Sequence, residues 1–106
     1  MSCIPKAARE EIHLRLVNWA AAMRTQVSSA PAPGLTPNEL DAAIVELRLL
    51  QMKRYRSRLY RVLWQRYMAR RGDVLAADTL RMPVHRFRDR ASEAYRWLYR
   101  ELPPIP

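Results

Sequence analysis

The chain has 106 residues, 49% of them hydrophobic and 27% charged, which is the composition of a folded globular protein with one modest core. Nineteen Lys and Arg residues against ten Asp and Glu residues give a formal net charge of +9, and seventeen of the nineteen are Arg. That excess attracts polyanions, namely nucleic acid, an anionic membrane or an acidic protein. The Arg fork fits phosphate oxygens and the guanine edge, which favours nucleic acid among them.

The sequence lacks the signals of export and membrane insertion. Residues 1–13 contain no apolar region of a secretory signal, and no apolar run approaches the roughly 20 residues of a membrane span. The single cysteine, Cys3, can form neither an internal disulfide nor a zinc site. We therefore expect a cytoplasmic protein with no metal and no cofactor.

An amphipathic helix is predicted over about residues 6–27. Apolar side chains recur there with the period of a helix, at Ile12, Leu16, Trp19, Ala20, Met23 and Val27. A linker is predicted over residues 28–35, because two prolines and Gly34 among small residues cannot sustain a helix. This linker is either a hinge before a helical domain at 36–102 or an ordered loop within a single domain, and residues 103–106 form a tail.

A second helix begins at a clear N-terminal signal. Thr36 stands at the N-cap, Pro37 at the first helical position and Glu39 three residues after the cap, which is a capping box with a proline start. The helix is predicted to end at about Arg54. The face that we expect to be buried carries Leu40, Ala43, Ile44, Leu47 and either Leu50 or Gln51.

Residues 51–71 form a basic segment with eight positive side chains and no acidic one. Ser57 is the predicted N-cap of a third helix, and Gly72 is predicted to end it. The helical spacing of its apolar residues favours core positions over a base-stacking platform for Leu59, Tyr60, Leu63, Trp64 and Tyr67. The lack of counter-charges makes the basic residues candidates for phosphate contact, namely Lys53, Arg54, Arg56, Arg58, Arg61, Arg66, Arg70 and Arg71.

A helix-turn-helix is predicted over residues 73–102. Asp73 is expected to cap a short helix that extends to Leu80. A turn follows at residues 81–83, because the residue before Pro83 leaves the α region. The second helix is predicted from about Pro83 to Leu102, and the following prolines stop it. A short helix, a turn and a longer helix are the outline of a DNA-binding motif.

The spacing within this segment predicts which side chains are buried and which face DNA. Ala76 or Ala77 is a small residue where two helices approach, and Leu80 and Met82 flank the turn. The buried face of the second helix carries Phe87, Ala91, Ala94 and Leu98. The opposite face and its flanks carry the expected DNA-contacting residues, which are His85, Arg86, Arg88, Asp89, Ser92 and Arg96.

The segment from Tyr60 to Leu102 resembles the helix-turn-helix of sigma region 4. The similar features are the helix at 63–67, the small residues of the first helix and the ending Trp97-Leu98. Over about residues 10–102 the layout resembles the Q-type late-gene antitermination factors of phages and a related antiterminator of a bacterial lysis cassette. The shared features are an N-terminal helix with Trp19-Ala20, a variable linker, a helix-turn-helix and, between them, a helix with Asp41, Ile44 and Leu47.

The resemblance implies a processive transcription antitermination factor rather than an enzyme. Such factors bind a promoter-proximal DNA element through the helix-turn-helix and load onto RNA polymerase paused with its sigma factor. They then suppress terminator hairpins at the RNA-exit channel. The basic segment 51–71 would contact polymerase, nascent RNA or the DNA backbone, and two protomers on one DNA element would be compatible with this layout.

The sequence departs from the family pattern at two positions and in its cysteine content. Arg81 occupies a turn position that is usually Gly, so either this L-residue accepts a left-handed backbone or the turn differs. Pro83 stands where Ser or Thr usually caps the recognition helix. Some members carry a zinc site built from cysteines, which this chain cannot form.

Two other functions are compatible with the residues. One is a helix-turn-helix regulator or phage packaging subunit that acts on DNA alone, and the other is a basic helical RNA-binding protein. An enzyme is disfavoured because His13 and His85 lack ligand-like partners and no glycine-rich phosphate loop is present. A membrane-surface protein is disfavoured because the basic residues are spread over several helices rather than one polar face.

Overall fold

The computed structural model describes residues 4–25 and 37–105. Within these ranges the chain is all helical, as the sequence predicts, and consists of α1 (Lys6–Thr25), α2 (Pro37–Tyr55), α3 (Ser57–Leu63), the π-helical turn η1 (Trp64–Met68), α4 (Asp73–Thr79) and α5 (Val84–Glu101). The predicted linker at 28–35 and the last two residues of the first predicted helix lie outside the described residues. No described helix is long and apolar enough to cross a membrane.

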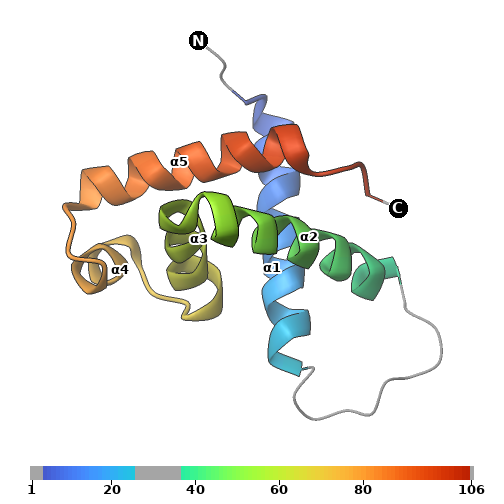
Figure 1. Ribbon diagram of the computed structural model, residues 1–106, viewed down its shortest axis with the longest axis horizontal. Helices are drawn as coiled ribbons and strands as arrows, with labels where there is room; N and C mark the ends of the chain where they lie inside the picture. The colour runs from blue at the N-terminus through green and yellow to red at the C-terminus, as the bar shows by residue number, and fades with distance from the viewer. Residues whose placement is uncertain (1–3, 26–36, 106) are drawn as a thin grey trace.

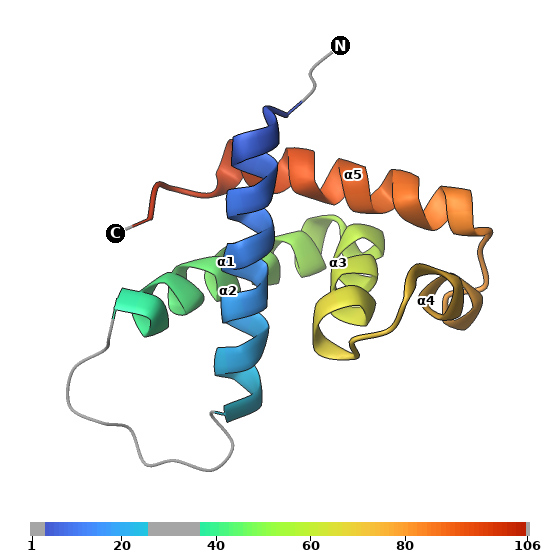
Figure 2. The ribbon, with the colours of Figure 1, turned by 180° about the vertical axis from the view of Figure 1, so that it is seen from behind.

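The N-terminal helix α1 and the C-terminal helix α5 cross near one end of the molecule. α1 packs across α2 and also contacts α5, so it crosses both of these helices (Figures 1 and 2). α3 lies between α2 and α5 and contacts both. α4 packs against α5 and η1 at the end of α5 that is far from α1 (Figure 1).

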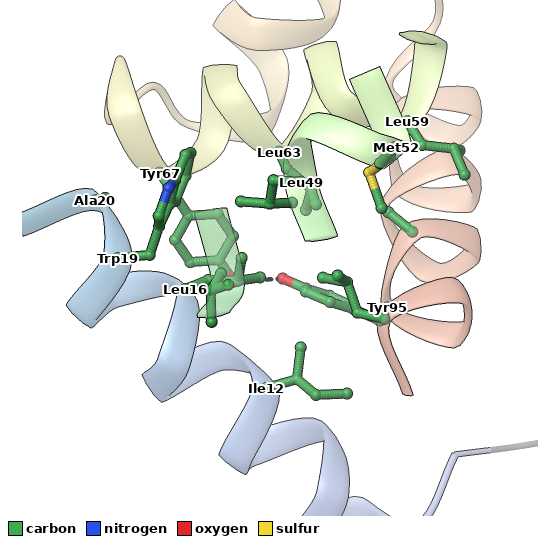
Figure 3. Packing of buried hydrophobic residues seen from close by; sticks show 13 residues of the cluster. Ile12, Leu16, Trp19, Ala20, Leu49, Met52, Leu59, Leu63, Tyr67 and Tyr95 are labelled. Atoms are coloured by element: carbon green, nitrogen blue, oxygen red, sulfur yellow. Dashed lines mark hydrogen bonds between the residues drawn. The ribbon is translucent and has the colours of Figure 1, made fainter. Parts of the chain in front are cut away.

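The main hydrophobic core lies where α1, α2, α3 and α5 meet. It contains Leu16 and Trp19 from α1, Leu49 from α2 and Leu63 from α3 (Figure 3). Leu98 of α5 belongs to the same cluster. Burying each of these large side chains contributes roughly 1.5–3 kcal/mol to the free energy of folding. The predicted buried stripe of the first helix is confirmed for Ile12, Leu16, Trp19 and Ala20.

The predicted buried face of the second helix is wrong. Leu40, Leu47 and Leu50 are exposed, while Val45 and Leu49 have no exposed surface. Apolar residues occur around most of this helix, so their period alone fits more than one face. The face that is buried in the structure begins with a charged residue, so the pattern of apolar residues does not predict it. It consists of Asp41, Ala42, Val45, Leu49 and Met52.

A buried ion pair explains why Asp41 is on the inner face of α2. The Arg15 guanidinium of α1 donates from Nη2 to Asp41 Oδ1 at 2.7 Å and from Nε to the same oxygen at 3.0 Å. Its Nη1 donates to the carbonyl oxygen of Pro103 at 2.8 Å. One arginine therefore joins α1, α2 and the segment that follows α5.

The helix ends between residues 56 and 73 differ from the sequence prediction. Arg56 occupies the N-cap of α3, and the predicted cap Ser57 is its first helical residue. The chain leaves the helical conformation after Met68, so Gly72 does not end this helix but is the N-cap of α4. Asp73 is the first residue of α4 rather than its cap, and its carboxylate binds two arginines.

The predicted core positions of the third helix are confirmed except at Trp64. Leu59, Leu63 and Tyr67 are buried, and Tyr60 is partly buried. Trp64 keeps 40% of its surface exposed. The prediction of Trp64 as a core residue is therefore wrong.

Candidate nucleic-acid interface

α4, the turn at 80–83 and α5 form a helix-turn-helix arrangement around a small core of their own. The predicted small residues Ala76 and Ala77 are fully buried against Phe87 and Ala91 of α5. Val62 of α3 completes this cluster, and Leu80, Met82 and Val84 pack partly buried against it. The close approach of α4 to α5 requires small side chains, and a larger residue at Ala76 or Ala77 would separate the two helices.

The turn between the two helices is a Schellman motif. The backbone N–H of Met82 donates to the carbonyl of Ala77, and that of Arg81 donates to the carbonyl of Asp78, both at 3.0 Å. Arg81 adopts the left-handed conformation with φ of 58°, so it accepts the backbone that glycine usually supplies. This conformation costs an L-residue roughly 1–2 kcal/mol relative to glycine. Pro83 is the N-cap of α5, one position earlier than a proline normally occupies in a helix.

The first turns of α5 expose the residues expected to contact DNA. His85, Arg86, Arg88, Asp89 and Arg96 are exposed, and Ser92 is partly buried. A shallow groove of about 340 Å³ runs along this face and is lined by His85, Arg86, Asp89, Arg90, Glu93 and Arg96. Arg90 and Glu93 are not among the residues predicted from the sequence, although both lie within one helical turn of predicted ones.

Arg88 lies on the flank of α5 that faces α4. Its Nε donates to Asp73 Oδ2 at 3.1 Å, and 63% of the side chain stays exposed. Arg66 donates from Nη2 to the other oxygen of Asp73 at 2.8 Å. Burial alone would raise the pKa of Asp73, but the hydrogen bonds from Arg66 and Arg88 outweigh it and hold that pKa below its usual value. Asp73 thus connects the start of α4 to α5 and η1.

The eight basic residues of segment 51–71 fall into two groups in the structure. Six are exposed, namely Lys53, Arg54, Arg56, Arg58, Arg61 and Arg70. Arg66 is partly buried and contacts Asp73, the Tyr95 hydroxyl at 3.1 Å and the Phe87 ring. Arg71 donates to Gln65 Oε1 at 2.9 Å and to Thr79 Oγ1 at 3.2 Å. The number of basic residues in the segment therefore overstates the number of cations that are free to bind a ligand, because Arg66 and Arg71 are bonded within the protein.

A chain of hydrogen bonds connects α1 to the helix-turn-helix through the core. His13 Nδ1 lies 2.8 Å from the Tyr67 hydroxyl. The Tyr67 hydroxyl lies 2.6 Å from the Tyr95 hydroxyl (Figure 3). Arg66 donates to Tyr95 and to Asp73, so the chain ends at α4. Nothing in the sequence indicates this pairing, because its members are separated by up to 54 positions. The network fixes α5 relative to α1 and so sets the direction in which its exposed face points.

Comparison with protein families, with curated proteins and with solved structures finds no match to this chain. The site itself consists of a short helix, a tight turn and a longer helix that exposes His85, Arg86, Arg88 and Arg96 together with Asp89. Among the described residues, no group of three His, Cys, Asp or Glu side chains is arranged to hold a metal ion.

Proposed function

We propose that this protein binds double-stranded DNA through α4 and α5 and acts in the cytoplasm as a transcription antitermination factor. The observation that carries the DNA-binding part is the exposed, arginine-bearing start of α5 in a helix-turn-helix whose other side is packed. In proteins of this architecture, the first residues of the second helix contact base edges in the major groove.

Charge supports a nucleic-acid partner. The net charge of +9 attracts a phosphate backbone at long range, and the exposed arginines of α5 are suited to guanine edges and phosphates. In this proposal Arg86 contacts guanine or phosphate, and Arg88 contacts the backbone from the flank where Asp73 holds it. Asp89 accepts from cytosine or orients a neighbouring arginine.

The antitermination part of the proposal is supported by the sequence resemblance to Q-type factors. It assigns RNA polymerase with its sigma factor as the second partner and the exposed cations at the end of α2 and in α3 as contacts for polymerase or nascent RNA. The main alternative is a helix-turn-helix regulator or packaging subunit that acts on DNA alone. A basic RNA-binding protein is the other, and it would prefer structured RNA over any duplex DNA at equal salt.

Transcription in vitro through an intrinsic terminator tests the proposal. The template carries the protein's own upstream promoter region, and a second template carries that region scrambled. We expect readthrough that depends on the intact region, and its loss in Arg86→Ala. Arg100→Ala is the matched control, because Arg100 is an exposed arginine near the other end of α5.

The outcomes separate the candidate functions. Readthrough on both templates would remove the DNA-loading step from the proposal. A footprint on the upstream DNA without readthrough would leave a regulator that acts on DNA alone. Absence of a footprint together with tight binding of structured RNA would favour the RNA-binding alternative.

A further inference from the structure

A second groove lies beside the helix-turn-helix, and it shares no lining residue with the α5 face. It has a volume of about 530 Å³ and is lined by Lys53, Ser57, Tyr60, Arg61, Trp64, Gln65 and Leu80. These residues come from the end of α2, from α3 and η1, and from the start of the turn before α5. Its volume falls in the range of roughly 300–1,000 Å³ in which small ligands bind to proteins.

The groove combines aromatic surface with positive charge from Lys53 and Arg61. Trp64 is 40% exposed. Tyr60, four positions earlier in the chain, is partly buried and also lines the groove. Lys53 Nζ lies 5.5 Å from the centre of the Tyr60 ring, so the ammonium group makes a cation–π contact with this ring. None of the described residues that line the groove is acidic.

The position of Trp64 is not explained by the stability of the fold. Exposing a large indole surface to water has a cost in free energy, because apolar area contributes about 25 cal/mol per Å² only when it is buried. Trp64 also begins the π-helical turn that closes where the Ala69 N–H donates to its carbonyl at 3.0 Å. Such turns are rare and are found frequently at functional sites.

We propose that this groove binds a nucleotide of a single-stranded nucleic acid. The base stacks on Trp64, and its phosphates lie against Lys53 and Arg61. Stacking of a base on an aromatic side chain contributes roughly 1–3 kcal/mol and needs a base whose face is free, which a paired duplex does not offer. The groove is therefore selective for single strands. This binding site is separate from the duplex contact that we propose for α5.

Fluorescence anisotropy with labelled oligonucleotides tests the groove. The probes are oligouridine RNA, oligothymidine DNA and a blunt DNA duplex, measured at one salt concentration with the full chain. We expect Trp64→Ala to weaken binding of single-stranded probes by about 5- to 100-fold and to leave binding of the duplex unchanged. Trp64→Phe keeps an aromatic face and is expected to retain most of the affinity.

Two further variants make the result specific to the groove. Tyr99→Ala removes an exposed aromatic side chain of α5 outside the groove, and we expect it to leave single-strand binding unchanged. Arg61→Glu reverses a charge in the groove without removing Trp64, and we expect it to weaken single-strand binding as well. It keeps the test decisive if Trp64→Ala fails to fold, which circular dichroism reports.

The two single-stranded probes identify the source of the ligand. Equal losses on RNA and DNA would support a site for bases and phosphates of either strand type, and a loss on RNA alone would support a transcript read partly through its 2′-hydroxyl groups. Unchanged single-strand binding in both Trp64→Ala and Arg61→Glu, or an equal loss on the duplex, would overturn the proposal. Failure of duplex binding in Arg86→Ala tests the α5 face separately, so the two proposals fail independently.

Discussion

The buried pair of Arg15 and Asp41 illustrates how much one polar contact can determine in a small core. Both side chains are removed from water, and the guanidinium also satisfies the carbonyl of Pro103. Removing one partner of such a pair leaves an unpaired buried charge, which lowers the free energy of unfolding by about 3–5 kcal/mol. The attraction between the two charges therefore contributes less to stability than the cost of leaving one of them buried and unpaired.

We expect Asp41→Ala to lower the free energy of unfolding by about 3–5 kcal/mol, measured by urea denaturation followed by circular dichroism. The double variant Arg15→Met/Asp41→Leu removes both charges and is expected to lose far less than the sum of the two single changes. If the losses simply add, the two side chains act independently and the pair does not stabilise the contact between α1 and α2.

The buried hydroxyl of Tyr67 is expected to make the folded protein less stable at alkaline pH. Burial raises the pKa of Tyr67 above its ordinary value of 10.0, the hydrogen bond with Tyr95 raises it further, and nearby Arg66 and Arg9 only partly oppose this. A folded-state pKa above the unfolded one gives stability that is complete below the unfolded value and is lost at higher pH. The loss begins at about pH 10, where the unfolded tyrosine starts to ionise.

We expect the free energy of unfolding to be constant below about pH 10 with respect to Tyr67 and to fall as the pH rises above about 10, measured by urea denaturation at each pH. Tyr67→Phe is expected to lower stability by about 0.5–1.5 kcal/mol at neutral pH, through the lost hydrogen bonds, and to flatten the alkaline fall. Tyr99→Phe, at an exposed tyrosine, serves as the control. An alkaline fall of the same size in Tyr67→Phe would assign it to other groups.

At the scale of elements, the orientation of α2 is the part of the fold most open to test. Leu47 and Leu49 are identical side chains two positions apart in one helix, yet 64% of the first is exposed and none of the second. We expect Leu49→Ala to lower the free energy of unfolding by about 2–5 kcal/mol and Leu47→Ala to change it by less than about 0.5 kcal/mol. Thermal and urea denaturation of the pair provide the measurement, and comparable losses in both would contradict the observed orientation.

Local signals in the sequence identify the helices well, and the reasons are physical. Pro37 begins α2 and Pro83 precedes α5, because proline fixes a backbone angle whatever the rest of the chain does. The buried face of α5 is also correctly predicted, since polar residues surround a single apolar stripe there. In α2 the apolar residues leave several faces possible, and Arg15, 26 positions away, decides among them.

The same distinction between local and distant causes applies to the candidate site. The exposed set on α5 follows from a 100° step once Phe87 is known to be inside, so it is predictable from the sequence. The roles of Arg66 and Arg71 are not, because Asp73, Tyr95 and Thr79 become their partners only in the folded chain. The groove at Trp64 likewise exists only where α2, α3 and the later turn meet.

At the scale of the whole molecule, the charge of +9 combines arginines that face solvent with arginines that hold the fold together. Only the first kind can release counterions from DNA, and each phosphate neutralised adds about −0.9 to the slope of log K against log salt. The salt dependence of binding therefore counts the cations that contact the duplex, which the net charge cannot do.

We expect Arg86→Ala and Arg96→Ala each to reduce the magnitude of that slope by about 0.9 if the residue contacts a phosphate. Arg71→Ala is expected to leave the slope unchanged and to lower thermal stability instead, because its guanidinium is bound to Gln65 and Thr79. Anisotropy titrations with one duplex over a series of salt concentrations measure all three. A decrease of the slope in Arg71→Ala equal to that in Arg86→Ala would mean that the internally bonded arginine is released to DNA on binding, so the basic segment 51–71 would belong to the duplex interface together with α5.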